Sequence, residues 1–264
     1  MDCSGKVALV TGAGDGIGRA CAIALAANGA FVIATDIDGA SAAKTAEMIG
    51  ADKARADKLD VTIEAEWQRI FADIAAQEGA IDIMVNNAGI AVGVPFVEMS
   101  LADWQRQNAV NLDGVFLGSK YAVLSMAAKG TGSIINLSSV AGLVGAPGLA
   151  GYCATKGGVR LFTKAAAVEL AGGGLNIRVN SVHPGLIDTA IWGKDIGGLL
   201  AVAPQMSSEG SNRLNVDEMS EKNVPGGKAG KPEDIANAVV FLASDASSYM
   251  TGSEVVIDHG LTAS

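Results

Sequence analysis

The sequence predicts an α/β fold: a doubly wound parallel sheet of about seven strands with helices on both faces, in a single domain spanning residues 1–264. Short apolar runs alternate with longer stretches of helical character along the chain. Of the 264 residues, 49% are hydrophobic, so one domain can bury a large core, and no linker divides it. The 34 glycines are about twice the average share, and many fall at strand-to-helix turns.

The expected elements alternate in order. Strands are expected at 6–11, 31–36, 58–61, 81–86, 132–137, 176–183 and 254–258. Helices are expected at 17–27, 41–49, 64–77, 101–129, 151–171 and 232–243. Right-handed crossovers between parallel strands would place a ligand crevice at the carboxyl ends of the strands, where the strand order reverses. Residues 190–230 are irregular and glycine-rich, which predicts a lid segment over the substrate.

A glycine-rich turn follows the first expected strand. Gly12, Gly16 and Gly18 form the pattern G-x-x-x-G-x-G, which differs from the usual G-x-G-x-x-G of dinucleotide sites. Glycine allows the backbone to approach a pyrophosphate, and the helix N-terminus attracts its charge. The turn therefore predicts a nucleotide site, with a plain strand-to-helix turn as the alternative.

The second expected strand ends in an acid. Asp36 lies 18 residues after Gly18, close to the ~20 expected for the carboxylate that binds the adenosine ribose 2′-hydroxyl. Asp15 adds a second negative charge, and no Arg or Lys occurs between Asp36 and Lys44. Because a carboxylate repels a 2′-phosphate, these residues predict NAD rather than NADP. The alternative is a solvated aspartate at a strand end.

Tyr152 and Lys156 are four residues apart on an expected helix and therefore share a face. A nearby ammonium group favours the phenolate, so Lys156 is expected to lower the phenol pKa from ~10 and make it usable as an acid or base. The hydroxyl of Ser139, thirteen residues upstream, could bind an oxygen held between it and the phenol. Alone, a Tyr and a Lys at this spacing are usually only a solvated pair.

Three further motifs accompany this pair. Residues 11–18 read TGAGDGIG, residues 86–89 read NNAG, and residues 180–185 read NSVHPG. Together with Ser139, Tyr152 and Lys156, and with Asn111 on the expected helix 101–129, they span nearly the whole chain. In these motifs the chain resembles the short-chain dehydrogenase/reductase family, whose fold is of the Rossmann type.

The resemblance implies roles for the catalytic positions. Tyr152 would be the general acid or base, and Lys156 would assist it and bind the nicotinamide ribose. Ser139 would polarise the substrate oxygen, and Asn111 would hold a water that links Lys156 to solvent. The backbone of Ile187 and the hydroxyl of Thr189 would bind the carboxamide. The cofactor residues implied are Gly12, Asp15, Gly16, Ile17, Gly18, Asp36, Ile37, Asp60, Val61, Asn87, Ala88, Gly89, Tyr152, Lys156, Pro184, Gly185, Ile187 and Thr189.

The expected substrate pocket is apolar and has no clustered Arg or Lys. Its expected substrate-binding residues are Val92, Ser139, Val144, Tyr152 and Trp192, and further wall candidates are Ala91, Val94, Ala141, Gly145, Leu149, Leu199 and Met206. This predicts a lipophilic, uncharged secondary alcohol or ketone that is cyclic, aromatic or steroid-like. Two alternatives remain: a ketoreductase acting on acyl-carrier-protein substrates and a non-catalytic dinucleotide-binding regulator.

Composition limits the partners. A net charge of −9 argues against nucleic acid and anionic membranes. Three scattered cysteines and two histidines predict no metal site and a reducing, cytoplasmic environment. The resemblance also implies a homotetramer, which the excess of apolar residues in the expected helices 101–129 and 151–171 supports. His183 is expected to be structural, and Asp258-His259-Gly260 stands where the family commonly has D-G-G.

Overall fold

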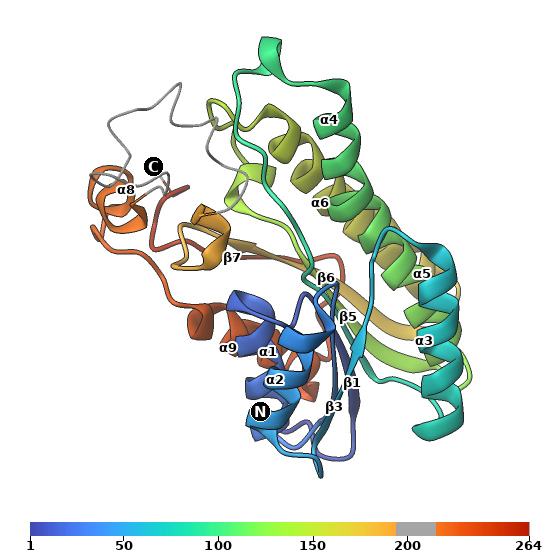
Figure 1. Cartoon of the computed structure of the whole chain (residues 1–264). Coiled ribbons are helices and arrows are strands. Elements are labelled where there is room, and N and C mark those ends of the chain that lie inside the picture. Colours follow the sequence, from blue (N-terminus) through green and yellow to red (C-terminus); the bar gives the residue numbers. More distant parts are fainter. Residues whose placement is uncertain (194–214, 264) are drawn as a thin grey trace.

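The computed structural model describes residues 1–193 and 215–263. Their strands form one parallel sheet in the order β3-β2-β1-β4-β5-β6-β7 (Figure 1). The strands are β1 Val7–Thr11, β2 Phe31–Asp36, β3 Ala54–Lys58, β4 Ile83–Asn86, β5 Thr131–Leu137, β6 Asn176–Pro184 and β7 Glu254–Ile257. The strand order reverses between β1 and β4, so the predicted doubly wound fold is confirmed.

Helices cover both faces of the sheet (Figure 1). On one face lie α1 Gly16–Ala27, α2 Gly39–Ile49 and α9 Pro232–Ala243. On the other lie α3 Glu64–Gln77, α5 Gly114–Met126 and α6 Ala150–Gly172. Each layer buries its own apolar cluster against the sheet, which explains why the central strands are apolar on both faces. Within the described residues, no helix has the length and apolar character needed to span a membrane.

The third strand lies earlier in the chain than predicted. The apolar pattern predicts this strand at 58–61, but β3 is Ala54–Lys58, paired with β2 from Val32↔Ala54 to Asp36↔Lys58. This strand is at the sheet edge and is largely polar, so the apolar pattern did not reveal it. Leu59 and Val61 are apolar because they are buried in the helical layer after the strand ends.

The long helix expected at 101–129 is interrupted. It consists of α4 Leu101–Asn108, a π-helical turn Ala109–Asp113, and α5. π-Turns of this kind often occur at functional sites, and this one contains Asn111.

The described parts of the expected lid segment 190–230 include regular elements. They contain a short 3₁₀ turn, Ala190–Gly193, and the helix α8 Val216–Asn223. Asn215 caps α8 by accepting hydrogen bonds from the Asp217 and Glu218 N–H groups. Two predicted wall residues, Leu199 and Met206, lie outside the described residues.

Candidate active site

The glycine turn after β1 packs against the segment that follows β4. Gly12 and Gly16 have left-handed backbones, with φ of 62° and 52°. A Cβ on Gly12 would lie 2.9 Å from both Ala88 Cα and Asn87 Nδ2. Asn87 Nδ2 donates to the carbonyl oxygens of Thr11 and Gly12, at 2.9 and 3.2 Å. Two motifs that are distant in the sequence therefore form one unit.

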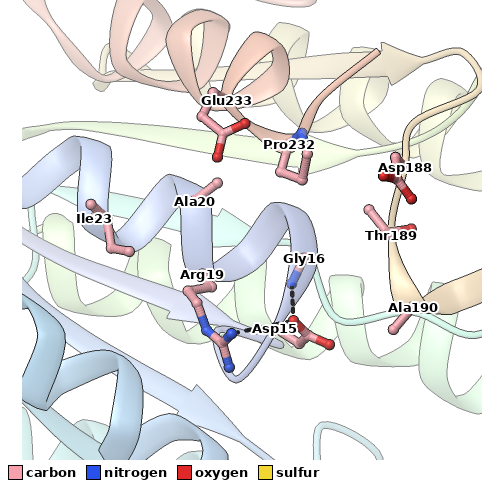
Figure 2. Close-up of a pocket in the computed structure, with 10 residues that line it drawn as sticks. All are labelled: Asp15, Gly16, Arg19, Ala20, Ile23, Asp188, Thr189, Ala190, Pro232 and Glu233. Carbon is pink, nitrogen blue, oxygen red and sulfur yellow. Dashed lines mark hydrogen bonds and ion pairs between the residues drawn. The ribbon is translucent and has the colours of Figure 1, made fainter. Parts of the chain in front are cut away.

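The N-terminus of α1 faces a cavity of about 370 Å³. Figure 2 shows Gly16 on one side of this cavity, with Thr189 across from it. The lining residues come from α1, from the segment after β6 and from the start of α9; they are Asp15, Gly16, Arg19, Ala20, Ile23, Asp188, Thr189, Ala190, Pro232 and Glu233. A Cβ on Gly16 would lie 3.4 Å from Thr189. The predicted cofactor residues Gly16 and Thr189 are therefore brought together.

The helix N-terminus offers features that fit a pyrophosphate. Gly16 leaves room at the first turn, and the free N–H groups of a helix start favour an anion. Asp15 caps the helix by accepting a hydrogen bond from the Gly16 N–H at 2.8 Å. Arg19 lies 3.4 Å from Asp15 and partly balances that charge (Figure 2). Ile17 is half-buried, and Gly18 lies so close to the Gly12 carbonyl that a side chain would overlap it.

Asp36, at the end of β2, lies directly against the glycine turn. Its carboxylate accepts hydrogen bonds from the N–H groups of Gly14 and Asp38, both at 2.9 Å. The next residue, Ile37, is 62% exposed. The Asp36 carboxylate therefore lies beside the glycine turn; its role in binding a ribose hydroxyl stays a prediction. Asp60 and Val61 have local partners: Asp60 accepts from the Thr62 N–H, and the Val61 carbonyl accepts from the Trp67 indole.

Three catalytic candidates meet at the carboxyl end of β5. The Ser139 hydroxyl accepts a hydrogen bond from the Ala141 N–H at 3.1 Å, and its interaction with the Tyr152 hydroxyl lowers the pKa of that phenol. Lys156 is 3% exposed, and its Nζ donates to the Leu137 carbonyl at 2.8 Å. The Lys156 Nζ lies 5.6 Å from the centre of the Tyr152 ring. The predicted trio is thus assembled in space.

Asn111 joins this group from the π-turn. Its Oδ1 accepts from the Ile90 N–H, and its Nδ2 donates to the Ile90 carbonyl, both at 2.8 Å. Nδ2 also donates to Thr155 Oγ1 at 3.1 Å. Gly89 lies between Asn111 and Lys156: a Cβ there would be 3.3 Å from Asn111 Oδ1 and 3.5 Å from Lys156 Nζ. The Asn111 side chain therefore clamps the strand-end segment beside Lys156.

His183 supports Ser139 from β6. Its buried ring lies 3.1 Å from the Ser139 carbonyl oxygen through Nδ1 and 2.9 Å from Ser181 Oγ through Nε2. Burial lowers the pKa of His183. His183 thus has the kind of backbone partner expected of a structural residue. It is followed by Pro184 and Gly185, which end β6 and begin the segment that leads to Thr189.

The sequence is similar to those of known proteins along nearly its whole length. The family model described as enoyl-(acyl carrier protein) reductase matches residues 12–262. The NADP-dependent (R)-specific alcohol dehydrogenase of Lentilactobacillus kefiri is 40% identical, over 98% of this chain and 97% of that protein. The 3-alpha-(or 20-beta)-hydroxysteroid dehydrogenase of Mycobacterium tuberculosis is 41% identical, over 98% and 90%. The cyclopentanol dehydrogenase of a Comamonas species is 41% identical, over 98% and 97%.

A solved structure is also similar along the whole chain. The short-chain type dehydrogenase/reductase from Mycobacterium marinum is 35% identical and superimposes with a TM-score of 0.86, covering 100% of this chain and 98% of that one. The chain belongs to the short-chain dehydrogenase/reductase family. As a member of this family it is an oxidoreductase, and its cofactor is a nicotinamide dinucleotide.

For this short-chain dehydrogenase/reductase, the structure corrects one electrostatic prediction. Lys156 was expected to lower the pKa of Tyr152, but burial raises that pKa to about 12, and the hydrogen bond with Ser139 offsets this only in part. Burial also lowers the pKa of Lys156 to about 8. The physical reason is that loss of solvation opposes both charged forms, and the ammonium lies beside the ring while donating to Leu137.

Tyr152 packs within an apolar cluster of buried and half-buried side chains. The cluster contains Ala91, Leu149, Tyr152, Leu186, Ile191, Trp192 and Met219. The Trp192 indole donates to the Ile187 carbonyl at 2.6 Å, which fixes its ring in this cluster. Sequence reasoning missed Leu186, Ile191 and Met219. The polar cap of α8 at Asn215, followed by two acids, was a local signal for the helix that carries Met219.

Two predicted substrate residues have other surroundings. Val144 is 51% exposed and is not among the apolar residues packed around Tyr152. Its carbonyl accepts a weak hydrogen bond from the Cys153 Sγ at 4.0 Å. On α6, Cys153 lies on a different face from Tyr152 and Lys156, so Val144 lies beside that other face. Val92 is buried, and its N–H donates to Gln107 Oε1 at 3.1 Å. Val92 is not among the apolar residues packed around Tyr152.

Proposed function

We propose that this protein is an NAD(H)-dependent dehydrogenase of lipophilic, uncharged secondary alcohols and their ketones, with cyclic, aromatic or steroid-like carbon skeletons. The observation that carries the proposal is the apolar cluster around the Tyr152 phenol, next to the Ser139 hydroxyl. The described side chains that pack around the phenol in this cluster are apolar, so they would offer no counter-charge to a phosphorylated or strongly anionic substrate that had lost its hydration. Relatives that act on cyclopentanol and hydroxysteroids support this substrate class.

The residues divide the chemistry among them. Tyr152 takes the hydroxyl proton of the alcohol in oxidation and returns it in reduction. Ser139 donates a hydrogen bond to the same substrate oxygen and so stabilises the developing alkoxide. Lys156 holds a proton beside the phenol. When bound, NAD⁺ supplies the hydride acceptor and a positive charge that favours the phenolate.

The dinucleotide would lie along the carboxyl ends of β1, β2, β4 and β6. Its pyrophosphate would meet Gly12 and Gly16, its adenosine ribose would meet Asp36, and its nicotinamide would meet Thr189 across the cavity of Figure 2. Asn111 would keep the Ile90 backbone in place beside this site, and a water bound near it would link Lys156 to solvent.

A substrate screen tests this proposal. Cyclopentanol, cyclohexanol, a 3α-hydroxysteroid and a 3-oxoacyl thioester would be assayed with NAD(H) and NADP(H) in parallel, by absorbance at 340 nm. We expect the highest kcat/KM for the cyclic alcohols or the steroid. A preference for the thioester with NADPH would favour the acyl-carrier-protein ketoreductase alternative. Tight nucleotide binding without turnover of any compound would indicate a regulator.

Cofactor choice is a separate prediction. Since the Asp36 carboxylate lies at the end of β2 against the glycine turn, kcat/KM should favour NAD over NADP by at least ~10-fold, about 1.4 kcal/mol. The double variant Asp36→Ser, Ile37→Arg should shrink this preference, because Ile37 is exposed and has room for a guanidinium. Asp36→Asn is the matched control, since it removes the charge and keeps the shape. A preference for NADP in the unchanged protein would contradict the assignment of NAD. The Lentilactobacillus relative is NADP-dependent, so both cofactors are to be assayed.

Assembly gives a further prediction. The outer faces of α5 and α6 expose large apolar side chains, including Phe116 and Leu124 on α5 and Leu161 and Val168 on α6. We propose that these faces pair between copies in a homotetramer with D2 symmetry. Light scattering at micromolar concentration should give about four times the mass of one chain. The double substitution Leu161→Glu, Val168→Glu should produce smaller species. A monomeric unchanged protein would refute this assembly.

A further inference from the structure

His259 has an unusual backbone conformation for its residue type. Its φ is 52°, and among the described residues it is the one non-glycine residue with positive φ. Glycine adopts this left-handed conformation without steric cost, and histidine does so less readily. An unfavourable conformation persists only when the surrounding contacts hold it, so the contacts of His259 are informative.

The backbone around His259 is anchored to the sheet. Asp258 directly follows β7, and its carboxylate accepts hydrogen bonds from the Gly260 N–H at 3.0 Å and from the Thr262 N–H and hydroxyl at 2.8 and 2.6 Å. Asp258 also packs against Gly185, where a Cβ would lie 2.8 Å from its Cα. His259 is therefore held in a defined place beside the end of β6.

The imidazole of His259 lies on the backbone of Gly226. A Cβ on Gly226 would be 2.7 Å from the His259 Nδ1 and closer still to two other ring atoms. The neighbouring Gly227 differs in kind: its φ is 64°, and a Cβ there would meet nothing within 4 Å. Gly226 is needed because the ring occupies its side-chain space, whereas Gly227 is needed for its backbone conformation.

Gly226 belongs to the turn that ends α8. The Gly227 N–H donates to the Val224 carbonyl at 2.8 Å, and Val224 itself is buried. Asn223 is the last residue of α8, and its side-chain amide donates back to the Met219 carbonyl at 2.8 Å. The Val224 N–H donates to the Ser220 carbonyl at 2.9 Å, so the helix and its turn are linked. Met219 packs in the apolar cluster with Tyr152. A continuous series of contacts thus runs from the sheet through His259, Gly226 and α8 to the wall beside the phenol.

We propose that His259 is a positioning residue for the substrate pocket: its ring sets where the C-terminal turn of α8 rests, and thereby where Met219 stands against Tyr152. The inference rests on the proposed function, which takes the apolar cluster around Tyr152 as the substrate wall. It assigns His259 an effect on substrate affinity and little effect on the dinucleotide, since the ring that is removed lies on Gly226, which is not one of the predicted cofactor residues.

The first test is His259→Gly, which suits the left-handed backbone and removes the ring. Amide hydrogen exchange in residues 216–227 should become about 10-fold faster, because the turn loses the surface on which it rests. With cyclohexanol as the probe, KM should rise by about 5-fold, while the NAD dissociation constant stays within about 2-fold. Unchanged exchange in residues 216–227 would overturn the proposal.

The second test is a double-mutant cycle with Gly226→Ala. In the unchanged background the new methyl group collides with the ring, so KM for cyclohexanol should rise by about 10-fold. In the His259→Gly background the same methyl group has space, and the alanine should have an effect of less than about 2-fold. Gly227→Ala is the matched control, since its backbone cost is independent of the ring and should be equal in both backgrounds. Equal damage by Gly226→Ala in both backgrounds would overturn the proposal.

The readouts separate this inference from the proposed function. Hydrogen exchange and NAD affinity require no turnover. Suppose that the protein oxidises none of the alcohols, but that substitutions at residues 226 and 259 still change the rate of hydrogen exchange in residues 216–227. The proposed function then fails, and the role of His259 in placing α8 stands. If cyclohexanol is oxidised and the two substitutions act independently, the proposed function stands and the inference fails.

Discussion

Replacing Tyr152 with Phe is expected to lower kcat for alcohol oxidation by at least about 10²–10⁴-fold while leaving the NAD dissociation constant within about 2-fold. The substitution removes only the hydroxyl, which interacts with Ser139 and is the proposed proton acceptor. The ring remains to pack with Trp192 and Met219, so the pocket should keep its shape. Single-turnover and steady-state assays with cyclohexanol, together with NAD titration, would measure these effects.

A remote tyrosine provides the control for this substitution. The Tyr121 hydroxyl donates to Glu64 Oε1 at 3.0 Å, on the surface of the α3–α5 layer. Tyr121→Phe removes the same atom far from the site and should leave kcat within about 2-fold. If Tyr152→Phe retained more than about a tenth of the activity, proton transfer would have to use another group.

Lys156→Met is expected to have opposite effects on activity and on stability. Turnover should fall by at least about 10²-fold, and NAD binding should weaken, because Lys156 is proposed to serve both the phenol and the ribose. The ligand-free protein should nevertheless be more stable at pH 7. The buried ammonium has its pKa lowered to about 8, so its charged form carries a folding penalty on the order of 3 kcal/mol below that pH. The substitution also removes the hydrogen-bond donor to the Leu137 carbonyl, which should reduce this gain in folding stability by about 1 kcal/mol.

The lowered pKa of Lys156 also predicts how folding stability changes with pH. Between the folded pKa of about 8 and the ordinary lysine value near 10.5, the unfolded chain holds the proton and the folded protein does not. Stability of the unchanged protein should therefore rise with pH in this window, and Lys156→Met should remove that rise. The raised pKa of Tyr152 acts in the opposite sense from about pH 10 to 12, where folded-state stability is lost.

Urea unfolding of the ligand-free protein at pH 7 and pH 9.5 would measure the effect through the transition midpoint. Lys120→Met is the control, because Lys120 is an exposed lysine paired with Glu64 and its pKa is raised rather than lowered. It should give no gain at pH 7. A Lys156→Met protein that is less stable at pH 7 and keeps the pH dependence of the unchanged protein would contradict the buried-charge account.

The sequence by itself determined the features that depend on neighbours along the chain. The alternation of apolar runs and helical stretches identified the α/β class and the order of the elements, because burial on both faces of a parallel strand requires continuous apolar residues. Glycine at Gly12 and Gly16, the acid at the end of β2 and the four-residue spacing of Tyr152 and Lys156 are equally local, and the structure has each at its predicted element.

Only the tertiary structure decided the properties that depend on segments distant in the sequence. The edge strand β3 is polar and is defined by its pairing with β2, so its residues carried no apolar signal. The pKa values of Tyr152 and Lys156 moved in the directions set by burial, a quantity that spacing on a helix does not contain. Met219 joins the wall beside Tyr152, and His259 rests on Gly226, through packing between elements far apart along the chain. Contacts of this kind form when several elements enclose the same side chains. The local sequence pattern of any one element therefore does not reveal them.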